Sequence, residues 1–395
     1  MAGPEADARP DRPVVPPVAT DLQISGPSDL DPTMTRISSL TTTVVDVPLD
    51  RPIRTAIHDI RSAGCILVDV ETSDGVVGQG YAFAINGRRL GAFDVVIRDF
   101  ADLVVGRSTG DAESIWQAIW DDCNPTGHAG ITVSALGAVD IAIWDAHAKS
   151  LGVPLHSLFG TCRDRIATYA SSGLWLSAGL EDLAREARGF VEQGFRAVKV
   201  RLGSPAIDED VARVRTVREA VGPDVAIHAD ANQGFDVDHA LALSRALEPF
   251  EPAWLEEPVS YDDLAGHARI RREGPVPVAT GETVFACGGI RKILEAGACD
   301  VLMPDLQRIG GYSEMRRATA LAAEAGMPVS THFFTEQSLT VAASTPGCAS
   351  VEHIDWFAPL FTEQVELVDG NLLVPDRPGT GFRFDEAARA RYRLV

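Results

Sequence analysis

Three acidic residues, each at the end of a short apolar segment, constrain the fold of this chain more than any other feature. Asp230, Glu256 and Glu282 follow one another at intervals of 26 residues. Loop or turn residues bound the apolar segments, and stretches of helical period lie between them, which is the pattern of strands that alternate with helices. Repeated units of this length predict a parallel barrel, in which the C-terminal ends of the strands meet at one face.

The alternation continues from about residue 166 into the C-terminal part of the chain. Strand-like runs occur near 167–174, 195–201, 225–230, 252–256, 277–282, 299–305, 327–332 and 350–353. The stretches of helical period between them include 180–193, 207–221, 236–249, 285–297 and 312–326. Eight strands with intervening helices predict an α/β protein of the (β/α)-barrel class, whose chemistry gathers at the strand C-termini.

The three acids at these strand ends predict a metal site. Carboxylates on neighbouring strands would repel one another unless a cation lay between them. Hard carboxylate oxygens suit Mg²⁺, and substrate oxygens can complete its octahedron. We therefore expect one Mg²⁺ bound by Asp230, Glu256 and Glu282. Any one of these acids alone could instead cap a helix, but their equal spacing and matching context favour a common site.

Two basic residues end the second strand-like run, Ala-Val-Lys-Val-Arg, at Lys199 and Arg201. Side chains alternate along a strand, so both of these residues point inward if either does. A lysine inside a barrel is costly unless it is paired, which implies an anionic ligand or a carboxylate partner. A structural salt bridge is the alternative interpretation.

The last three strand-like runs carry residues suited to acid–base chemistry. The sixth ends at Asp305 and the seventh at His332. An aspartate beside a histidine holds one tautomer and raises the basicity of the imidazole, as a general base requires. A histidine satisfied within the core is the alternative. The eighth run carries Glu352, which could donate a hydrogen bond if its surroundings keep it protonated.

The N-terminal part has a different pattern. Residues 1–34 are rich in Pro, Asp, Ala and Gly without sustained periodicity, which predicts a disordered tail. Strand-like segments then turn at Ser-Asp-Gly, so Gly75, Gly78 and Gly80 indicate a hairpin rather than a phosphate loop. Helical segments follow these strands, and residues 35–160 are therefore expected to form a small α+β unit.

A polar segment, residues 52–62, lies between the first two strand-like segments of this unit. Placed over a barrel mouth, it would form a lid that selects substrates. Its candidate substrate-binding residues are Arg54, His58 and Arg61. A solvated loop without a role in binding is the alternative, and the spacing of the residues does not decide between the two.

Charge, apolar runs and cysteine content indicate which partners and which compartment to expect. The net charge of −21 argues against nucleic acid and anionic membranes as partners, although it does not exclude an anionic substrate. No uninterrupted apolar run reaches the length of a membrane span. The N-terminus lacks a secretory signal, and the six cysteines, without C-x-x-C spacing, are typical of reduced thiols. We therefore expect a cytoplasmic protein.

Several short motifs, taken in order, resemble the enolase superfamily and, within it, the mandelate racemase subgroup (mandelate racemase/muconate lactonizing enzyme family). They are Lys-x-Arg, Asp-Ala-Asn-Gln, Trp-Leu-Glu-Glu-Pro, Gly-Glu, Met-Pro-Asp, Ser-Thr-His-Phe and the final Glu352. The resemblance extends from about residue 36 to the C-terminus. It implies a modified TIM barrel, (β/α)₇β, at 161–364 with an N-terminal α+β capping domain at 35–160. The segment at about 365–395 is expected to return to the capping domain.

The resemblance also implies a reaction, which is Mg²⁺-assisted removal of the proton α to a carboxylate. The implied metal ligands are Asp230, Glu256 and Glu282, and the implied catalytic residues are His332, Asp305, Lys199 and Glu352. Asn232 would touch metal-bound substrate oxygens, and Arg201, His58 and Arg61 would bind substrate. Relatives of this kind assemble as dimers to octamers, so we expect a homo-oligomer acting on a small-molecule carboxylate.

One departure from the racemase-like pattern bears on the reaction. That pattern has a second lysine, which acts as a base, where this chain has Arg201. A guanidinium is a poor proton acceptor, but its paired N–H groups are good hydrogen-bond donors to carboxylate or hydroxyl oxygens. A one-base reaction is therefore favoured, namely dehydration of an aldonate or aldarate to a 2-keto-3-deoxy acid. Racemisation or epimerisation of a 2-hydroxy acid, and a non-catalytic barrel that binds metal and anion, are the alternatives.

Overall fold

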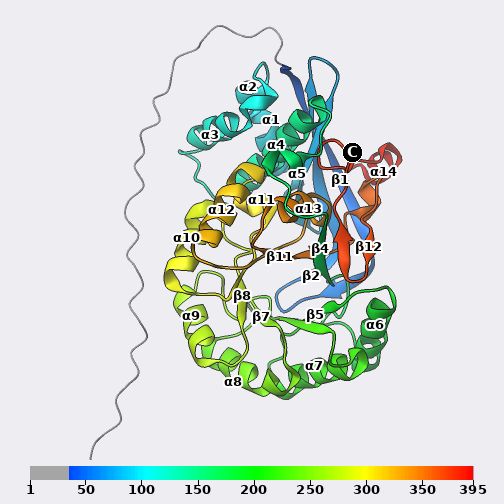
Figure 1. Cartoon of the computed structure of the whole chain (residues 1–395), viewed down its shortest axis with the longest axis vertical. Helices are drawn as coiled ribbons and strands as arrows, with labels where there is room; N and C mark the ends of the chain where they lie inside the picture. The colour runs from blue at the N-terminus through cyan, green and yellow to red at the C-terminus, as the bar shows by residue number, and fades with distance from the viewer. Residues whose placement is uncertain (1–34, 395) are drawn as a thin grey trace, which may run out of the picture. The chain divides into compact units, whose positions relative to one another are not determined.

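Eight parallel strands form a closed barrel in the computed structural model, which describes residues 35–394 (Figure 1). The strands are β4 (Arg165–Ala170), β5 (Ala197–Arg201), β6 (Ala226–Asp230), β7 (Trp254–Glu256), β8 (Val278–Thr280), β9 (Val301–Leu302), β10 (Val329–Thr331) and β11 (Cys348–His353). Each strand pairs with the next along the chain, and β11 closes the ring on β4. The predicted barrel is therefore confirmed.

Helices follow the first seven strands and surround the barrel, as Figure 1 shows. They are α6 (Leu180–Glu192), α7 (Ile207–Val221), α8 (Val237–Leu247), α9 (Leu264–Glu273), α10 (Ala286–Ala296), α11 (Leu306–Ile309) with α12 (Tyr312–Glu324), and α13 (Thr335–Ser344). Each helix turns an apolar stripe toward the strands. In α6, for example, Leu183 and Ala187, four residues apart, are buried. No α-helix directly follows β11, so the order is (β/α)₇β, as expected.

The N-terminal part pairs an antiparallel sheet with helices. Its strands are β1 (Ile37–Arg54), β2 (Asp59–Thr72) and β3 (Val77–Ile85). Its helices are α1 (Leu90–Asp99), α2 (Ala101–Val104), α3 (Ala112–Asp122), α4 (Ile131–Ser150) and α5 (Leu155–Phe159). The predicted α+β unit is thus observed, and β2 turns into β3 through a hairpin in which Gly75 has a positive φ of 83°. The expected tail lies outside the described residues.

Glycines in β3 let α4 pack directly on the sheet. A Cβ added at Gly78 would lie 2.1 Å from the carbonyl oxygen of Ala142, and one added at Gly80 would lie 2.2 Å from that of Ala138. Helix α4 is long and apolar enough to cross a membrane by length and composition alone. In the structure 78% of that stretch is buried, so α4 serves as the core helix of the capping part.

The segment expected to be a lid loop is mostly strand. After a register shift between Pro48 and Ile53, β1 and β2 pair again at Ile53 opposite Ile60 and at Arg54 opposite Asp59, which leaves a turn of four residues, 55–58. The expectation of a loop across 52–62 was wrong, because the facing isoleucines are both buried and extend the ladder. The turn itself reaches the barrel mouth, where Thr55, Ile57, His58 and Ile60 line a cavity.

Polar contacts fix the capping part on the barrel. Gln307 in α11 bonds both backbone polar groups of one residue: its Oε1 accepts from Phe83 N–H at 2.6 Å, and its Nε2 donates to Phe83 O at 3.2 Å. The indole N–H of Trp116 donates to Gly310 O at 2.7 Å. Ser313 Oγ donates to the buried Asp140 at 2.6 Å. These bonds join helices of the barrel to the sheet and helices that cover it.

The C-terminal segment contacts both parts. The short strands β12 (Leu367–Val368) and β13 (Asn371–Leu373) form a hairpin that pairs with β4 of the barrel. Helix α14 (Glu386–Tyr392) then returns to the capping sheet, where Arg389 forms an ion pair with Asp69 at 2.6 Å. Leu394 N–H donates to Val44 O at 2.9 Å. The boundaries proposed for the two domains stay a prediction.

The packing of α4 on β3 predicts the effect of adding one methyl group. Gly78→Ala is expected to destabilise the protein by about 2–3 kcal/mol, because the new Cβ overlaps backbone atoms of α4. Gly91→Ala in α1 is the control, since nothing lies within 4 Å of its Cβ position; it should be neutral or stabilise by up to about 1 kcal/mol. Urea unfolding of both variants measures this. Equal stability of the two would contradict the proposed packing role.

Candidate active site

A cavity of about 260 Å³ lies at the C-terminal face of the barrel, where the capping part covers it. Its lining from the capping part is Thr55, Ile57, His58, Ile60, Phe83 and Ile85. Its lining from the barrel is Trp175, Lys199, Arg201, Asp230, Asn232, Gln233, Tyr261, Glu282, Thr283, Arg308, His332, Phe333 and Trp356. The polar residues predicted from the strand ends therefore meet under an apolar roof.

The three predicted metal ligands follow from the register of neighbouring strands. Asp230, the last residue of β6, is the parallel partner of Glu256, the last residue of β7, and Glu282 follows two residues after β8. All three side chains are buried. Burial, together with the charge of Asp230, raises the pKa of Glu256 to about 8. Such crowding of acids is unfavourable without positive charge beside them.

Protein cations contact these carboxylates. Lys199 Nζ lies 2.8 Å from Glu256 Oε1 and 3.4 Å from Asp230 Oδ2, while His332 Nε2 lies 3.1 Å from Glu282 Oε2. Within residues 35–394, no three His, Cys, Asp or Glu side chains already form a coordination shell. Carboxylate oxygens that a metal ion would need are in contact with Lys199 and His332 instead.

The donor set nevertheless fits a hard divalent cation. Three carboxylates supply oxygen ligands of the kind that Mg²⁺ prefers. Asn232 donates its backbone N–H and its Nδ2 to Asp230, at 2.9 and 3.1 Å. Its Oδ1 is buried without a hydrogen-bond partner, so one more oxygen is available beside the acids. The assignment of Asp230, Glu256 and Glu282 as ligands remains a proposal that this chemistry supports.

Lys199 lies at the centre of the acidic cluster. Its ammonium also lies 2.6 Å from Glu352 Oε1, and the side chain is almost completely buried. Burial alone would lower the pKa of Lys199, but Glu256, Glu352 and Asp230 raise it well above its ordinary value. The ammonium therefore stays charged, and a fixed positive charge faces the cavity.

His332 and Asp305 form the expected pair. His332 Nδ1 lies 2.7 Å from Asp305 Oδ2, and an isolated backbone bridge joins the two residues. The aspartate therefore favours the tautomer with the proton on Nδ1, which leaves Nε2 toward the cavity. Burial lowers the pKa of His332, but Glu282 and Asp305 more than offset this, so the pKa lies above its ordinary value. A cation held by Glu282 would oppose that rise.

Glu352 differs from the expectation of a protonated donor. It accepts hydrogen bonds from Ser171 Oγ at 2.5 Å and from Phe333 N–H at 2.9 Å, besides its contact with Lys199. Burial raises the pKa of Glu352, but Lys199 and His332 outweigh that effect and hold it below its ordinary value. The surroundings thus favour an ionised carboxylate, because positive charges that the sequence could not place lie against it.

Arg201 is less able to bind substrate oxygens with two of its nitrogens than the sequence suggested. Its Nη1 donates to Ser171 O at 3.1 Å and its Nη2 to Ser171 Oγ at 2.9 Å. The guanidinium lies over the ring of Trp175, 4.1 Å from its centroid. Only Nε is left without a hydrogen-bond partner, 3.6 Å from Asp230 Oδ2. Contacts within the protein therefore already engage both Nη atoms of Arg201.

The three candidate substrate-binding residues of the lid segment have different positions. Arg54 is exposed at the end of β1 and lies outside the lining of this cavity. His58 lines the cavity at the turn, where burial and Arg308 lower its pKa. Arg61 is exposed on β2 and lies outside the cavity lining. Side chains alternate along a strand, and because Ile60 faces the cavity, Arg61 faces away. The expectation that Arg61 binds substrate is therefore corrected.

Sequence reasoning missed some residues that line the cavity. Arg308 donates to Glu282 O at 2.8 Å, from the first turn after Asp305. Gln233 bonds Glu257 and Thr283, and so holds together the loops that follow β6, β7 and β8. Both residues follow strand ends directly, which was a usable signal. Phe83 and Ile85 had no such signal, because they lie in the capping sheet, far from the barrel in sequence.

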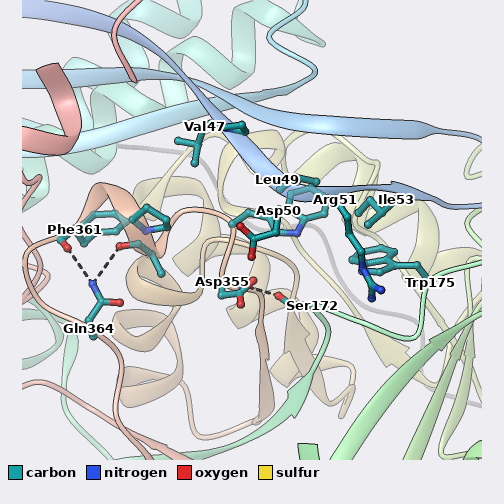
Figure 2. A pocket seen from close by; sticks show the side chains of 14 residues that line it. Val47, Leu49, Asp50, Arg51, Ile53, Ser172, Trp175, Asp355, Phe361 and Gln364 are labelled. Atoms are coloured by element: carbon teal, nitrogen blue, oxygen red, sulfur yellow. Dashed lines mark hydrogen bonds between the residues drawn. The ribbon is translucent and has the colours of Figure 1, made fainter. Parts of the chain in front are cut away.

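A larger hollow of about 770 Å³ lies beside this cavity (Figure 2). Trp175 and Trp356 line both spaces, and their ring centroids are 5.8 Å apart. The hollow carries the exposed Asp50 and Asp355, and Asp355 N–H donates to Ser172 Oγ at 2.9 Å. None of the predicted site residues line it. The smaller cavity, which is lined by Asp230, Glu282 and His332, is therefore the candidate active site.

Comparison with known families agrees with this arrangement. A family model described as "Mandelate racemase / muconate lactonizing enzyme, N-terminal domain" matches residues 39–160. A second, "Enolase C-terminal domain-like", matches residues 182–388.

Individual relatives cover most of the chain. L-talarate/galactarate dehydratase of Salmonella typhimurium is 33% identical over 331 residues, 84% of this chain and 83% of that protein. 3,6-Anhydro-alpha-L-galactonate cycloisomerase of Streptomyces coelicolor is 35% identical over 321 residues, 81% and 89% of the two chains. The crystal structure of L-talarate dehydratase from Polaromonas sp. JS666 with Mg and L-glucarate has a TM-score of 0.84 at 31% identity and covers 91% of this chain and 98% of that one.

The acidic cluster predicts that Mg²⁺ stabilises the folded protein. Addition of Mg²⁺ at about 100 times its Kd should raise the free energy of unfolding by about 2.7 kcal/mol, because only the folded state brings the acids together. Asp230→Asn should lose most of this gain in thermal unfolding. Asp263→Asn, at the N-cap of α9, is the control, since asparagine also caps helices. An unchanged response of Asp230→Asn would show that Asp230 is not a ligand.

Proposed function

The chain belongs to the mandelate racemase/muconate lactonizing enzyme family of the enolase superfamily, and from this premise we propose that it dehydrates a sugar acid with the help of Mg²⁺. The substrate class is an aldonate or aldarate, and the product is a 2-keto-3-deoxy acid. The observation that carries the proposal is the imidazole of His332, which Asp305 orients toward a cavity lined by Lys199, Asp230 and Glu282.

The metal would be held by Asp230, Glu256 and Glu282. When bound, Mg²⁺ supplies positive charge that stabilises the substrate carboxylate as its negative charge grows. Relatives support this choice of ion, since the Polaromonas dehydratase was crystallised with Mg and L-glucarate. The oxygen-only donor set of this chain is consistent with it.

The first step is removal of the proton from the α-carbon. His332 Nε2 accepts this proton, and the C–H electron pair moves toward the substrate carboxylate. Asp305 accepts from Nδ1–H at 2.7 Å and stabilises the imidazolium that forms. Lys199, a buried ammonium, stabilises the negative charge that collects on the carboxylate oxygens. Without such fixed charges, an imidazole would be too weak a base for this proton.

The second step expels the β-hydroxyl. Protonated His332 returns its proton to the departing oxygen, so that water leaves as the C–O bond breaks. The enol that remains tautomerises to the 2-keto-3-deoxy acid. One residue thus serves as base and then as acid, and no external reactant is required beyond the substrate itself.

Arg201 favours this one-base reaction over racemisation. Inversion at the α-carbon needs a proton donor on the face opposite His332. Arg201 has both Nη groups on Ser171 and its guanidinium stacked on Trp175, and a guanidinium does not give up its proton at ordinary pH. Dehydration is therefore the function that the cavity supports best.

The assembly and the compartment also belong to the proposal. We expect a homo-oligomer, from dimer to octamer, and a cytoplasmic location. The six free cysteines are consistent with a reducing compartment. Analytical ultracentrifugation of the purified protein would measure its assembly, and a monomer at micromolar concentration would contradict the expected oligomer.

The reaction can be identified by a screen in D₂O. With Mg²⁺ and a panel of aldonates and aldarates, the protein should yield a 2-keto-3-deoxy acid that has lost one water. The recovered substrate should contain no inverted α-deuterated isomer, because Arg201 stands where the racemase-like pattern has its second base and a guanidinium stays protonated. Mass spectrometry and NMR measure both. An inverted isomer that carries α-deuterium and has lost no water would indicate a racemase, and no turnover across the panel would indicate a binding protein.

The assigned base predicts the effect of one substitution. His332→Asn should lower kcat about 10²–10⁴-fold, because the amide cannot accept the α-proton. His267→Asn is the control: His267 is also fully buried, but it lies in α9, where its Nδ1 contacts Asp263 O at 3.0 Å. Its activity per folded molecule should be preserved. Full activity of His332→Asn would refute the assignment.

A further inference from the structure

Strand β7 places an indole directly below one of the acids. Trp254, Leu255 and Glu256 alternate along the strand, so Trp254 and Glu256 share the inner face of the barrel. Trp254 is almost fully buried and packs with Tyr169, Ala279 and Met303. The proposed function gives no part to this tryptophan.

The indole makes a specific contact with the acid. Trp254 Nε1–H donates to Glu256 Oε2 at 3.0 Å, while the other oxygen, Oε1, faces Lys199 Nζ at 2.8 Å. The two oxygens of one carboxylate are thus differentiated. A neutral donor that cannot ionise in this pH range holds Oε2, and a cation lies against Oε1.

Neighbouring rings fix the orientation of the indole. His228 is the parallel-strand partner of Trp254 and stacks on it with ring centroids 3.5 Å apart and planes 20° apart. Tyr169 contacts the indole edge-on, with a centroid separation of 5.6 Å and an interplanar angle of 84°. An indole held on two sides cannot swing its N–H away from Glu256 without disturbing the inner layer of the barrel.

From these contacts we propose that Trp254 is a positioning residue for the metal site. It holds Oε2 of Glu256 in place, so that Oε1, the oxygen that faces Lys199, is the one presented to Mg²⁺. A ligating carboxylate that is fixed by a hydrogen bond binds metal more tightly than a free one, and loss of such a partner costs about 10–100-fold in affinity. The inference rests on the Mg²⁺ site of the proposed function.

The test compares two tryptophans that each donate one buried hydrogen bond. Trp254→Phe removes the bond to Glu256, and Trp116→Phe removes the bond to Gly310 O where the capping part meets the barrel. Calorimetric titration with Mg²⁺ should show about 10–100-fold weaker binding for Trp254→Phe and unchanged binding for Trp116→Phe. Mn²⁺ bound in place of Mg²⁺ should show an altered electron paramagnetic resonance spectrum only in Trp254→Phe.

A second replacement distinguishes the loss of the hydrogen bond to Glu256 from the loss of the bicyclic ring of Trp254. The benzothienyl analogue of tryptophan at position 254 keeps the bicyclic ring and lacks the N–H, so it should weaken Mg²⁺ binding as Trp254→Phe does, with little change in Tm. Normal Mg²⁺ affinity of this analogue would overturn the positioning role while leaving the metal site intact. If the unsubstituted protein bound no Mg²⁺, the proposed function itself would fail.

Discussion

The buried ammonium of Lys199 is the interaction on which the site depends. Moving one charged group out of water is costly unless opposite charges lie close to it. Glu256 and Glu352 lie within 2.8 Å of this nitrogen, and Asp230 lies at 3.4 Å. The acids in turn can share a buried space because the ammonium neutralises part of their repulsion. Closure of the barrel brings the strands that carry these groups into one ring. The fold therefore creates the contacts between Lys199 and the acids, and these contacts offset the cost of burying the charges.

The barrel and the capping part contribute different kinds of side chain to the cavity. The barrel supplies groups on rigid strand ends, where parallel register sets which side chains are neighbours. The capping part supplies the apolar roof and the turn at 55–58, which the bonds of Gln307 hold over the barrel. The cavity is therefore lined by two segments of the chain that are far apart in sequence.

Sequence reasoning placed the barrel and the groups at its strand ends because both depend on local periodicity. The helical stretches that it named as examples do not include α9, which buries only Gly266, His267 and Ile270 and so has a weak apolar stripe. It also expected Arg201 to reach the substrate with two nitrogens. That orientation depends on Ser171 and Trp175, which lie about thirty residues away on another strand end, and no local pattern encodes such a contact.

The return of the C-terminal helix to the capping sheet has a consequence for biosynthesis. Strand β1 leaves the ribosome early, yet its neighbours include Leu394, which bonds Val44, and α14 packs beside it. The same helix neutralises Asp69 through Arg389. Domains that fold during translation do so when all their segments have emerged. The first sheet of this protein therefore stays incompletely covered until α14 has been translated.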